Sequence, residues 1–230
     1  RYAVEHDTMD TTFRSMYLGL SAFLDANTER RELLLGQRPP RFDSSFDEAI
    51  ALTGDDFERV ALKAESARDY FLLVGPPGTG KTSRALRRMV EHFYAASSMQ
   101  ILLLAYTNRA VDEICQSLSS ITPGIDYIRV GSELSCDVRF RGHLLENILA
   151  ECNSRREVNT RMTDCRVYVG TVASIAAKAE LFKLKRFDVA IVDEATQILE
   201  PQLLGILCAK FADERNAVGK FILIGDHKQL

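Results

Sequence analysis

The residues with the clearest chemical role form a glycine-rich run between residues 75 and 82. This run, GPPGTGKT, matches the pattern G-x-x-x-x-G-K-[ST] at every fixed position. Glycines let successive backbone N–H groups point into one concavity, and a following helix adds partial positive charge at the same place. The pattern therefore predicts a site for the phosphates of a nucleoside triphosphate, formed by Gly75, Pro76, Pro77, Gly78, Thr79, Gly80, Lys81, Thr82 and Ser83.

Two side chains of this run have specific expected roles. Lys81 is expected to reach the β- and γ-phosphates, and the hydroxyl of Thr82 is expected to ligate Mg²⁺. Residues 70–74 form a short apolar run typical of a buried parallel strand, and residues 83–95 follow a helical pattern. A strand, a glycine-rich loop and a helix in this order are the context that a phosphate-binding loop requires.

A second apolar run, residues 189–192, ends in two carboxylates. Asp193 is expected to hold the Mg²⁺ shell opposite Thr82, and Glu194 to orient or deprotonate the attacking water. The pattern alone is weak, because many strands end in acidic residues that cap the next helix. It gains specificity here because it follows a phosphate loop.

Small polar residues follow two further apolar runs, at residues 101–105 and 167–170. Side chains of this kind commonly cap the first turn of a helix. The same free N–H groups and hydroxyls can also hold a nucleic-acid phosphate. Because the carboxyl ends of parallel strands share one edge, we expect these residues on the same edge as the phosphate loop: Thr107, Asn108, Thr171 and Ser174.

A last apolar run, residues 221–224, leads into the polar sequence GDHKQL. Its carboxyl end is expected at the same ligand-binding edge. Gln229 is therefore a candidate for sensing the γ-phosphate, and Asp226 for positioning the loop.

Length and composition indicate an ordinary globular chain. It has 230 residues, of which 46% are apolar and 27% are charged, and its net charge is −3. This charge gives no support for bulk affinity for nucleic acid, so any such site must be a local patch. The chain has no apolar run near 18 residues and no secretory signal pattern, and its five cysteines show no C-x-x-C spacing. We expect a cytoplasmic protein with no membrane partner and reduced thiols.

The alternation of short apolar runs with helical patterns from residue 70 onward predicts an α/β fold with a mostly parallel sheet and helices on both faces. Residues 8–36 are predicted as helical with a break near Asn27 and Thr28, and residues 44–66 as helical with a turn near Thr53. Residues 118–166 interrupt the alternation and are predicted to be an inserted subdomain, with a strand at residues 127–130 and a helix that carries Leu144, Leu145, Ile148, Leu149 and Cys152.

Together these segments resemble superfamily 1 helicases, especially the group of the nonsense-mediated-decay RNA helicase and the replication nuclease–helicase. Five runs of the chain, in order, look like motifs I, Ia, Ic, II and III of that family: GPPGTGKT, AYTNRAVDEI, GTVASI, DEATQ and GDHKQL. The resemblance implies a first RecA-like motor domain over residues 46–230, preceded by an N-terminal helical segment over residues 1–45. That segment is either a hairpin packed on the core or the end of an accessory domain.

The resemblance also implies partners and cofactors. Motifs Ia and Ic would contact single-stranded DNA or RNA, and ATP or another nucleoside triphosphate would bind with Mg²⁺. The chain begins at Arg1 and ends within motif III, so we expect a piece of a longer protein. The second RecA-like domain, which supplies arginines worth roughly 10³–10⁵ in rate, is not in these residues, and the piece alone is expected to be weak or inactive.

One departure from the family concerns the base. The family usually carries a glutamine that contacts adenine about a dozen residues before the first strand, whereas residues 55–59 here are DDFER. Base selectivity is therefore open. Two other classes of function also remain open: a P-loop switch or chaperone-like ATPase without a nucleic-acid role, and a non-catalytic scaffold.

Overall fold

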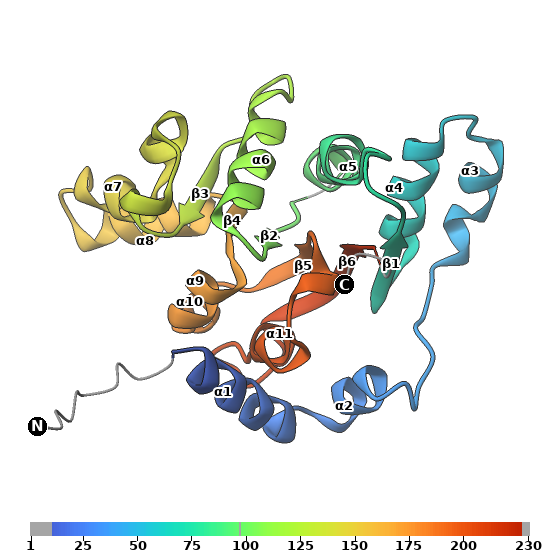
Figure 1. Ribbon diagram of the computed structural model, residues 1–230, viewed down its shortest axis with the longest axis horizontal. Helices are drawn as coiled ribbons and strands as arrows, with labels where there is room; N and C mark the ends of the chain where they lie inside the picture. The colour runs from blue at the N-terminus through green and yellow to red at the C-terminus, as the bar shows by residue number, and fades with distance from the viewer. Residues whose placement is uncertain (1–10, 97, 227–230) are drawn as a thin grey trace, which may run out of the picture.

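A six-stranded parallel sheet forms the centre of the domain, in the order β1-β6-β5-β2-β4-β3 (Figure 1). The computed structural model describes residues 11–96 and 98–226. The described strands are β1 (Tyr70–Val74), β2 (Ile101–Ala105), β3 (Tyr127–Val130), β4 (Val167–Thr171), β5 (Phe187–Val192) and β6 (Val218–Gly225). Neighbouring strands pair in parallel, so their carboxyl ends meet at one edge. The predicted α/β fold is confirmed.

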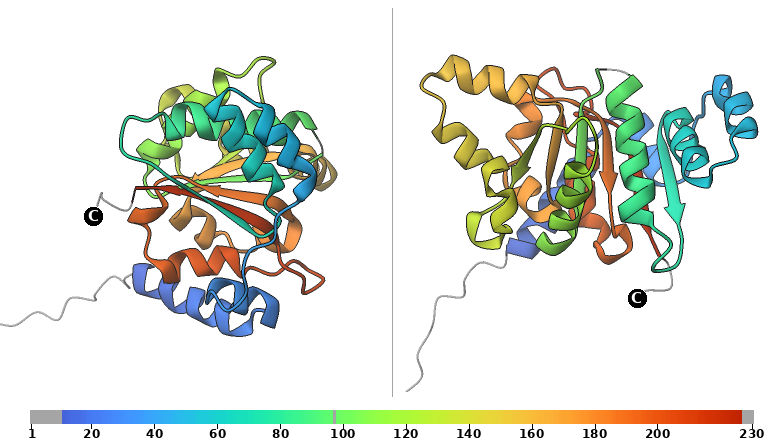
Figure 2. Two further views of the ribbon diagram at one scale, coloured as in Figure 1. Left: turned by 90° about the vertical axis from the view of Figure 1, so that its right-hand side faces the viewer. Right: turned by 90° about the horizontal axis from the view of Figure 1, so that it is seen from above.

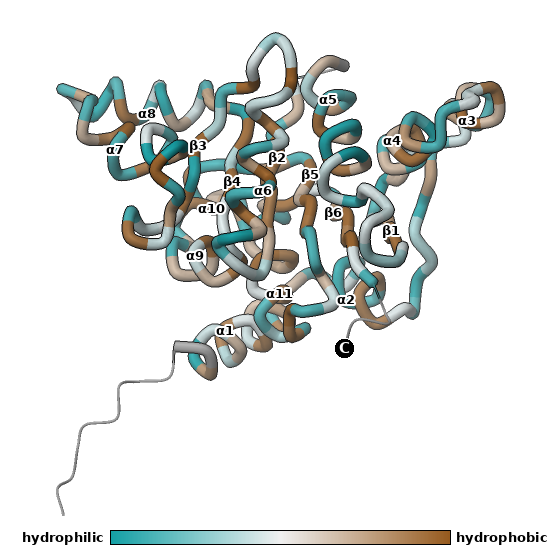
Figure 3. Tube along the Cα trace, turned by 45° about the horizontal axis from the view of Figure 1, so that its top comes forward, coloured by the Kyte–Doolittle hydropathy of each residue, from teal (hydrophilic) through white to brown (hydrophobic). Residues whose placement is uncertain are grey.

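Alternate side chains of β2 pack into two separate cores. Ile101 and Leu103 belong to one hydrophobic cluster, whereas Leu102 and Leu104 belong to the other, as the two-residue repeat of a strand requires. Figure 2 shows the sheet between two layers of helices, and Figure 3 shows the hydrophobic residues along its central strands. The first layer holds α4 (Asp56–Ser66), α5 (Arg87–Ala96) and α6 (Asn108–Ser119), and the second holds α9 (Val172–Ala177), α10 (Leu181–Leu184) and α11 (Glu200–Leu207).

The N-terminal segment packs on the second layer through α1 (Thr11–Asp25) and α2 (Thr28–Leu34). Asn27 separates the two helices, because its side chain accepts the N–H of Arg30 at 2.8 Å and caps α2. The guanidinium of Arg30 is buried and donates to the carbonyls of Val218 and Gly219 at 2.7 and 3.0 Å. The predicted break at this point is confirmed, and the segment is anchored to the start of β6.

Helix α1 crosses α11 at Gly19, where a side chain has no room. A Cβ atom at this position would lie 1.8 Å from the carbonyl oxygen of Pro201. We expect Gly19→Ala to displace α1, since an overpacked contact with backbone costs about 1–3 kcal/mol. Limited proteolysis within α1 should then be faster than in Gly54→Ala, whose added Cβ would meet nothing within 4 Å. Equal cleavage rates in the two variants would show that the crossing tolerates a side chain.

The segment before β1 contains a short 3₁₀ turn and two helices, and the sequence pattern predicts the two helices and the turn near Thr53 between them. They are η1 (Ser44–Phe46), α3 (Asp47–Leu52) and α4. Asp55 begins α4 by accepting the N–H of Phe57 at 2.8 Å. Asp69, just before β1, accepts hydrogen bonds from the guanidiniums of Arg38 and Arg41, which ties the chain leaving α2 to the start of the sheet.

Residues 118–166 extend the sheet and then project beyond it (Figure 1). Strand β3 pairs with β4 in the register Tyr127↔Val167 and forms one edge of the sheet. The rest of the stretch forms η3 (Glu133–Ser135), η4 (Val138–His143), α7 (Leu145–Ala150) and α8 (Arg155–Asp164). The expected helix near Leu144 is therefore shorter than its apolar pattern indicates. Arg129, 1% exposed, fixes β3 to α6 through an ion pair with Asp112.

No helix in the described part of the chain combines the length and apolar character needed to cross a membrane.

Candidate functional site: a phosphate loop beside a row of capped helices

The glycine-rich run forms a loop between β1 and the helical turn η2 (Lys81–Leu86), which continues into α5. Gly78 and Gly80 have φ values of +76° and +80°, a region that L side chains adopt only with strain. The N–H groups of Arg84 and Ala85 both bond to the carbonyl of Gly80 at 2.9 Å, which makes a wide first turn. The N–H groups that begin a helix have no acceptor within it, so the donors of this turn can bind a phosphate.

Lys81 lies over the loop itself. Its Nζ donates to the carbonyl oxygens of Gly75 and Pro76 at 2.5 and 2.8 Å. A second contact closes the loop, since the hydroxyl of Thr79 donates to the same carbonyl of Pro76 at 2.8 Å. The ammonium of Lys81 is thus held at the loop, and it must exchange these carbonyls for phosphate oxygens to perform its expected role.

Thr82 and Asp193 meet across the site although they lie far apart in the chain. The Thr82 hydroxyl donates to a carboxylate oxygen of Asp193 at 2.6 Å. Asp193 is 2% exposed, and burial raises its pKa, while hydrogen bonds from Thr82 and from the Glu194 N–H oppose that rise. A buried carboxylate beside a hydroxyl is a donor set that fits Mg²⁺. The charge of a divalent cation would also offset the cost of burying Asp193.

Glu194 follows directly and has a left-handed backbone, with φ 52° and ψ 36°. A non-glycine residue in this conformation carries backbone strain, and such strain clusters at functional sites. Burial, followed by the negative charges of Asp193 and Glu113, raises the pKa of the Glu194 carboxyl. A carboxylate with a raised proton affinity beside the Thr82–Asp193 pair can accept a proton from water.

Thr107 and Asn108 lie beside this acidic pair, because β2 pairs with β5 in the register Leu104↔Val192. Thr107 caps α6 by accepting the N–H of Ala110 at 3.1 Å. Asn108 begins the helix and is exposed. An exposed amide next to a capped helix start can bind a backbone phosphate.

Thr171 and Ser174 lie one strand further along the same edge, at the end of β4. Thr171 is 6% exposed and accepts the N–H of Ser174 at 3.0 Å, which caps α9. The hydroxyl oxygen of Ser174 lies 3.0 Å from the carbonyl oxygens of both Val130 and Thr171, so its single proton is donated within the protein. Both hydroxyls are therefore engaged within the protein, and they hold the β3–β4 edge together.

The remaining motif is only partly described. Gln229 lies outside the described residues, and so does the rest of residues 227–230. Gly225 ends β6 against Thr196, since a Cβ atom there would lie 2.8 Å from the Thr196 methyl carbon. Asp226 is 5% exposed, and its N–H points to the Thr196 hydroxyl at 3.5 Å. The end of β6 is thus packed on the turn that follows Glu194.

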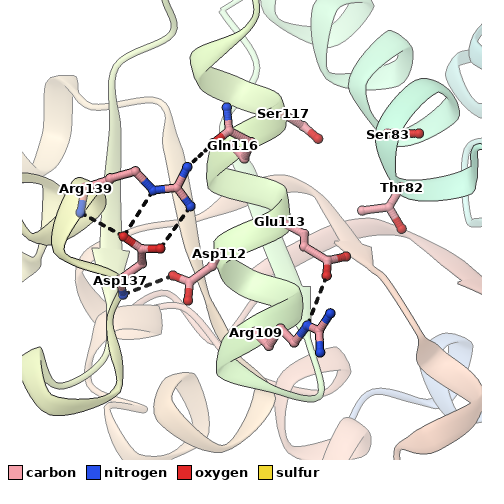
Figure 4. A pocket seen from close by; sticks show the side chains of 9 residues that line it. All are labelled: Thr82, Ser83, Arg109, Asp112, Glu113, Gln116, Ser117, Asp137 and Arg139. Atoms are coloured by element: carbon pink, nitrogen blue, oxygen red, sulfur yellow. Dashed lines mark hydrogen bonds and ion pairs between the residues drawn. The ribbon is translucent and has the colours of Figure 1, made fainter.

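A cavity of about 450 Å³ lies next to Thr82, between η2, α6 and the start of η4. Figure 4 shows Glu113 extending from α6 toward Thr82, with Arg109 beneath it at 3.5 Å. Glu113 was not among the site residues predicted from the sequence, although the i,i+4 spacing of Arg109 and Glu113 on a helix is a recognisable charge pattern. Its position matters because its charge acts on both Asp193 and Glu194.

Metal binding by cysteine has no support in the described residues. Within residues 11–96 and 98–226, no three His, Cys, Asp or Glu side chains gather closely enough to hold an ion. Burial raises the pKa of the Cys115, Cys165 and Cys208 thiols to about 11. These thiols are packing groups of low reactivity.

Comparison with known proteins supports the family resemblance. The family model described as AAA domain matches residues 58–230. The chain belongs to this family. The DNA replication ATP-dependent helicase/nuclease JHS1 of Arabidopsis thaliana is 32% identical over 242 residues, which cover 100% of this chain and 17% of that protein. The DNA replication ATP-dependent helicase/nuclease DNA2 of Xenopus laevis is 34% identical over 168 residues, covering 71% of this chain and 14% of that protein.

Among solved structures, the UvsW helicase from bacteriophage T4 matches with a TM-score of 0.48 and 15% identity, over 79% of this chain and 59% of that chain. These relatives confirm the predicted resemblance of the chain to the replication nuclease–helicase group of superfamily 1. The chain spans about a sixth of the length of these relatives.

Proposed function

We propose that these residues form the first motor domain of an ATP-dependent DNA helicase or translocase. The observation that supports this proposal most strongly is that the proposed nucleotide-binding and strand-binding residues lie along one edge of the sheet. The Thr82–Asp193 pair lies at 2.6 Å, and the exposed start of α6 follows on the next strand. Nucleotide and strand would therefore act on neighbouring ends of the same rigid sheet.

In the proposed reaction the loop donors and Lys81 bind the phosphates, and Glu194 accepts a proton from the attacking water. Thr82 and Asp193 would hold Mg²⁺, which when bound neutralises charge on the transferring phosphoryl group. The strained backbone of Glu194 at the end of β5 supports this role. Gln229 remains a proposed γ-phosphate sensor.

The proposed strand contacts are Thr107 and Asn108, together with the α9 cap at Thr171 and Ser174. Because the hydroxyls of Thr171 and Ser174 bond within the protein, we propose that this second cap acts through its backbone. The two relatives described above are named for DNA replication, which favours single-stranded DNA over RNA as the strand.

The domain assignment is part of the same proposal. Residues 46–230 would form the motor domain, with residues 118–166 as its inserted subdomain and residues 1–45 as a helical segment outside it. Hydrolysis would require the second RecA-like domain of the full-length protein. A P-loop ATPase without a nucleic-acid role would use only the phosphate loop and the acidic pair, and it would leave the exposed α6 start unexplained.

The double substitution Thr107→Ala and Asn108→Ala tests the strand site. In the full-length protein we expect it to weaken binding of labelled single-stranded DNA by roughly tenfold, since two hydrogen bonds to phosphate are lost. Nucleotide binding should be unchanged. Fluorescence anisotropy measures the first quantity, and titration with a fluorescent ATP analogue measures the second.

Two controls separate binding from folding. The single variant Thr107→Ser keeps the hydroxyl that accepts the N–H of Ala110, so its DNA affinity should match that of the unsubstituted protein. Ser119→Ala changes the far end of α6 and should also leave DNA affinity unchanged. Unchanged DNA affinity in the double variant would remove the α6 start from the strand site.

A further inference from the structure

The direction in which a nucleotide leaves the phosphate loop follows from the Thr82–Asp193 contact. The metal ligands lie on the β5 side of the loop. The terminal phosphates must face that side, and Lys81 and the turn η2 lie behind them. Helix α4 packs on η2 and β1, on the opposite side of the loop, so we expect the nucleoside of the same molecule to extend over η2 toward the start of α4.

A flat cationic surface lies on that opposite side. The guanidinium of Arg84 stacks over the ring of Phe57, with 5.0 Å between the guanidinium carbon and the ring centroid. Arg84 is exposed, while Phe57 is half-buried beneath it. Gly80 makes room for this arrangement, because a Cβ atom there would lie 3.1 Å from Cδ of Arg84.

The polar side chains around Phe57 are engaged by other groups. The carboxylate of Glu58 accepts Nε of Arg88 at 2.7 Å and contacts Nε2 of His92 at 2.7 Å. Asp55 caps α4 through the N–H groups of Phe57 and Glu58. The guanidinium of Arg59 donates to Asp56 at 2.6 Å and to the carbonyl of Thr53 at 2.7 Å.

This arrangement favours stacking and disfavours hydrogen-bonded recognition of a base edge. Stacking tolerates every base, because every base has a π-face. A site that hydrogen-bonds a substrate edge discriminates by roughly 10⁴–10⁵, because the wrong substrate leaves buried polar groups unpaired. Residues 55–59 contain no asparagine or glutamine, and each of their charged side chains already has a partner in the protein.

We propose that this site accepts nucleoside triphosphates with little regard to the base, and that the Arg84–Phe57 stack is the surface on which the base rests. This inference rests on the proposed function as an NTP-driven motor. It names the substrate class of that motor as nucleoside triphosphates in general.

The test uses the full-length protein and two measurements. Hydrolysis of ATP, GTP, CTP and UTP is followed with Mg²⁺ and single-stranded DNA, and the kcat/KM values should agree within about tenfold. Fluorescent ATP and GTP analogues are then bound to the Glu194→Gln protein, with inorganic tripolyphosphate as a competitor. Binding in this variant needs neither hydrolysis nor DNA.

Arg84→Ala should weaken ATP and GTP binding about tenfold each, by loss of the stacking surface. It should leave the affinity for tripolyphosphate within about twofold of the unsubstituted protein, a split that damage to the phosphate loop would not produce. Arg87→Ala is the control, because Arg87 begins α5 directly after η2 and pairs with Glu91 at 2.9 Å.

A preference for ATP over GTP above about tenfold would overturn the proposal. So would an Arg84→Ala protein that loses tripolyphosphate affinity as strongly as ATP affinity. The base inference and the motor assignment can fail independently of each other. Equal binding of ATP and GTP without DNA-stimulated hydrolysis would retain the base inference and reject the motor, whereas DNA-stimulated hydrolysis specific for ATP would do the reverse.

Discussion

Replacing Lys81 with alanine in the full-length protein is expected to reduce nucleotide hydrolysis by at least about 10²–10³-fold and to weaken nucleotide binding. Loss of one preorganised donor to a developing charge has an effect of this size, and Lys81 carries a full positive charge. Its Nζ already lies at the loop, held by the carbonyls of Gly75 and Pro76 at 2.5 and 2.8 Å.

The control for this variant is Lys210→Ala. Lys210 pairs with Glu214 on the surface at 3.0 Å, so it tests the loss of a lysine without disturbing the loop. Steady-state hydrolysis and titration with a fluorescent nucleotide measure the two effects. A Lys81→Ala protein that turns over at the rate of the Lys210→Ala protein would contradict the assignment of the loop.

The second large effect is expected for Glu194→Gln. Glutamine has the same shape and keeps the left-handed backbone at this position, but it cannot accept a proton from water. Hydrolysis should fall by about 10²–10⁴-fold, while nucleotide binding stays within a few-fold of the unsubstituted protein. Single-turnover hydrolysis separates these quantities, and a variant that turns over normally would show that Glu194 is not the base.

The pH dependence supplies a check on the same residue. Burial and the charges of Asp193 and Glu113 raise the pKa of Glu194. A base works only when deprotonated, so kcat/KM should fall as the pH drops through this raised pKa. Glu113→Gln removes one of the negative charges and should move the acidic limb to lower pH, with Mg²⁺ held constant. A limb that stays in place would separate Glu113 from the reaction.

Much of the fold was predictable because buried parallel strands carry continuous apolar runs. The runs at residues 70–74 and 101–105 are strands β1 and β2 with the same limits. Only β2 is buried throughout, however: β1 lies at the edge of the sheet and none of its residues is buried, so the expectation of a buried strand at residues 70–74 is wrong. Strand β6 begins three residues earlier than its apolar run, at Val218, because pairing with Phe187 extends it. Hydrogen bonding to a neighbour, which the local pattern does not contain, sets that boundary.

Helix α8 was not predicted because its sequence has almost no apolar face. Residues 155–164 are RREVNTRMTD, and none of them is buried. The available signal was the cap: Ser154 accepts the N–H of Glu157 at 3.2 Å, which is the S-x-x-E pattern of a helix start. Hydrophobic periodicity alone therefore does not detect a helix without buried side chains.

The functional site also combines features that the sequence predicts with features that it does not. The phosphate loop is a continuous run, so the sequence contains it completely. Two other features depend on how separate helices face each other: the Arg84–Phe57 stack and the position of Glu113 opposite Thr82. No local pattern encodes these contacts, because they arise when α4 and α6 pack beside η2.

ATP hydrolysis by the full-length protein, with and without single-stranded DNA or RNA and beside Glu194→Gln, decides whether the domain belongs to a nucleic-acid motor. We expect strong stimulation by DNA that disappears in the variant. Hydrolysis that is indifferent to both polymers would contradict this expectation. Thr107 and Thr171 would then be helix caps only, and the domain would belong to an ATPase without a nucleic-acid role.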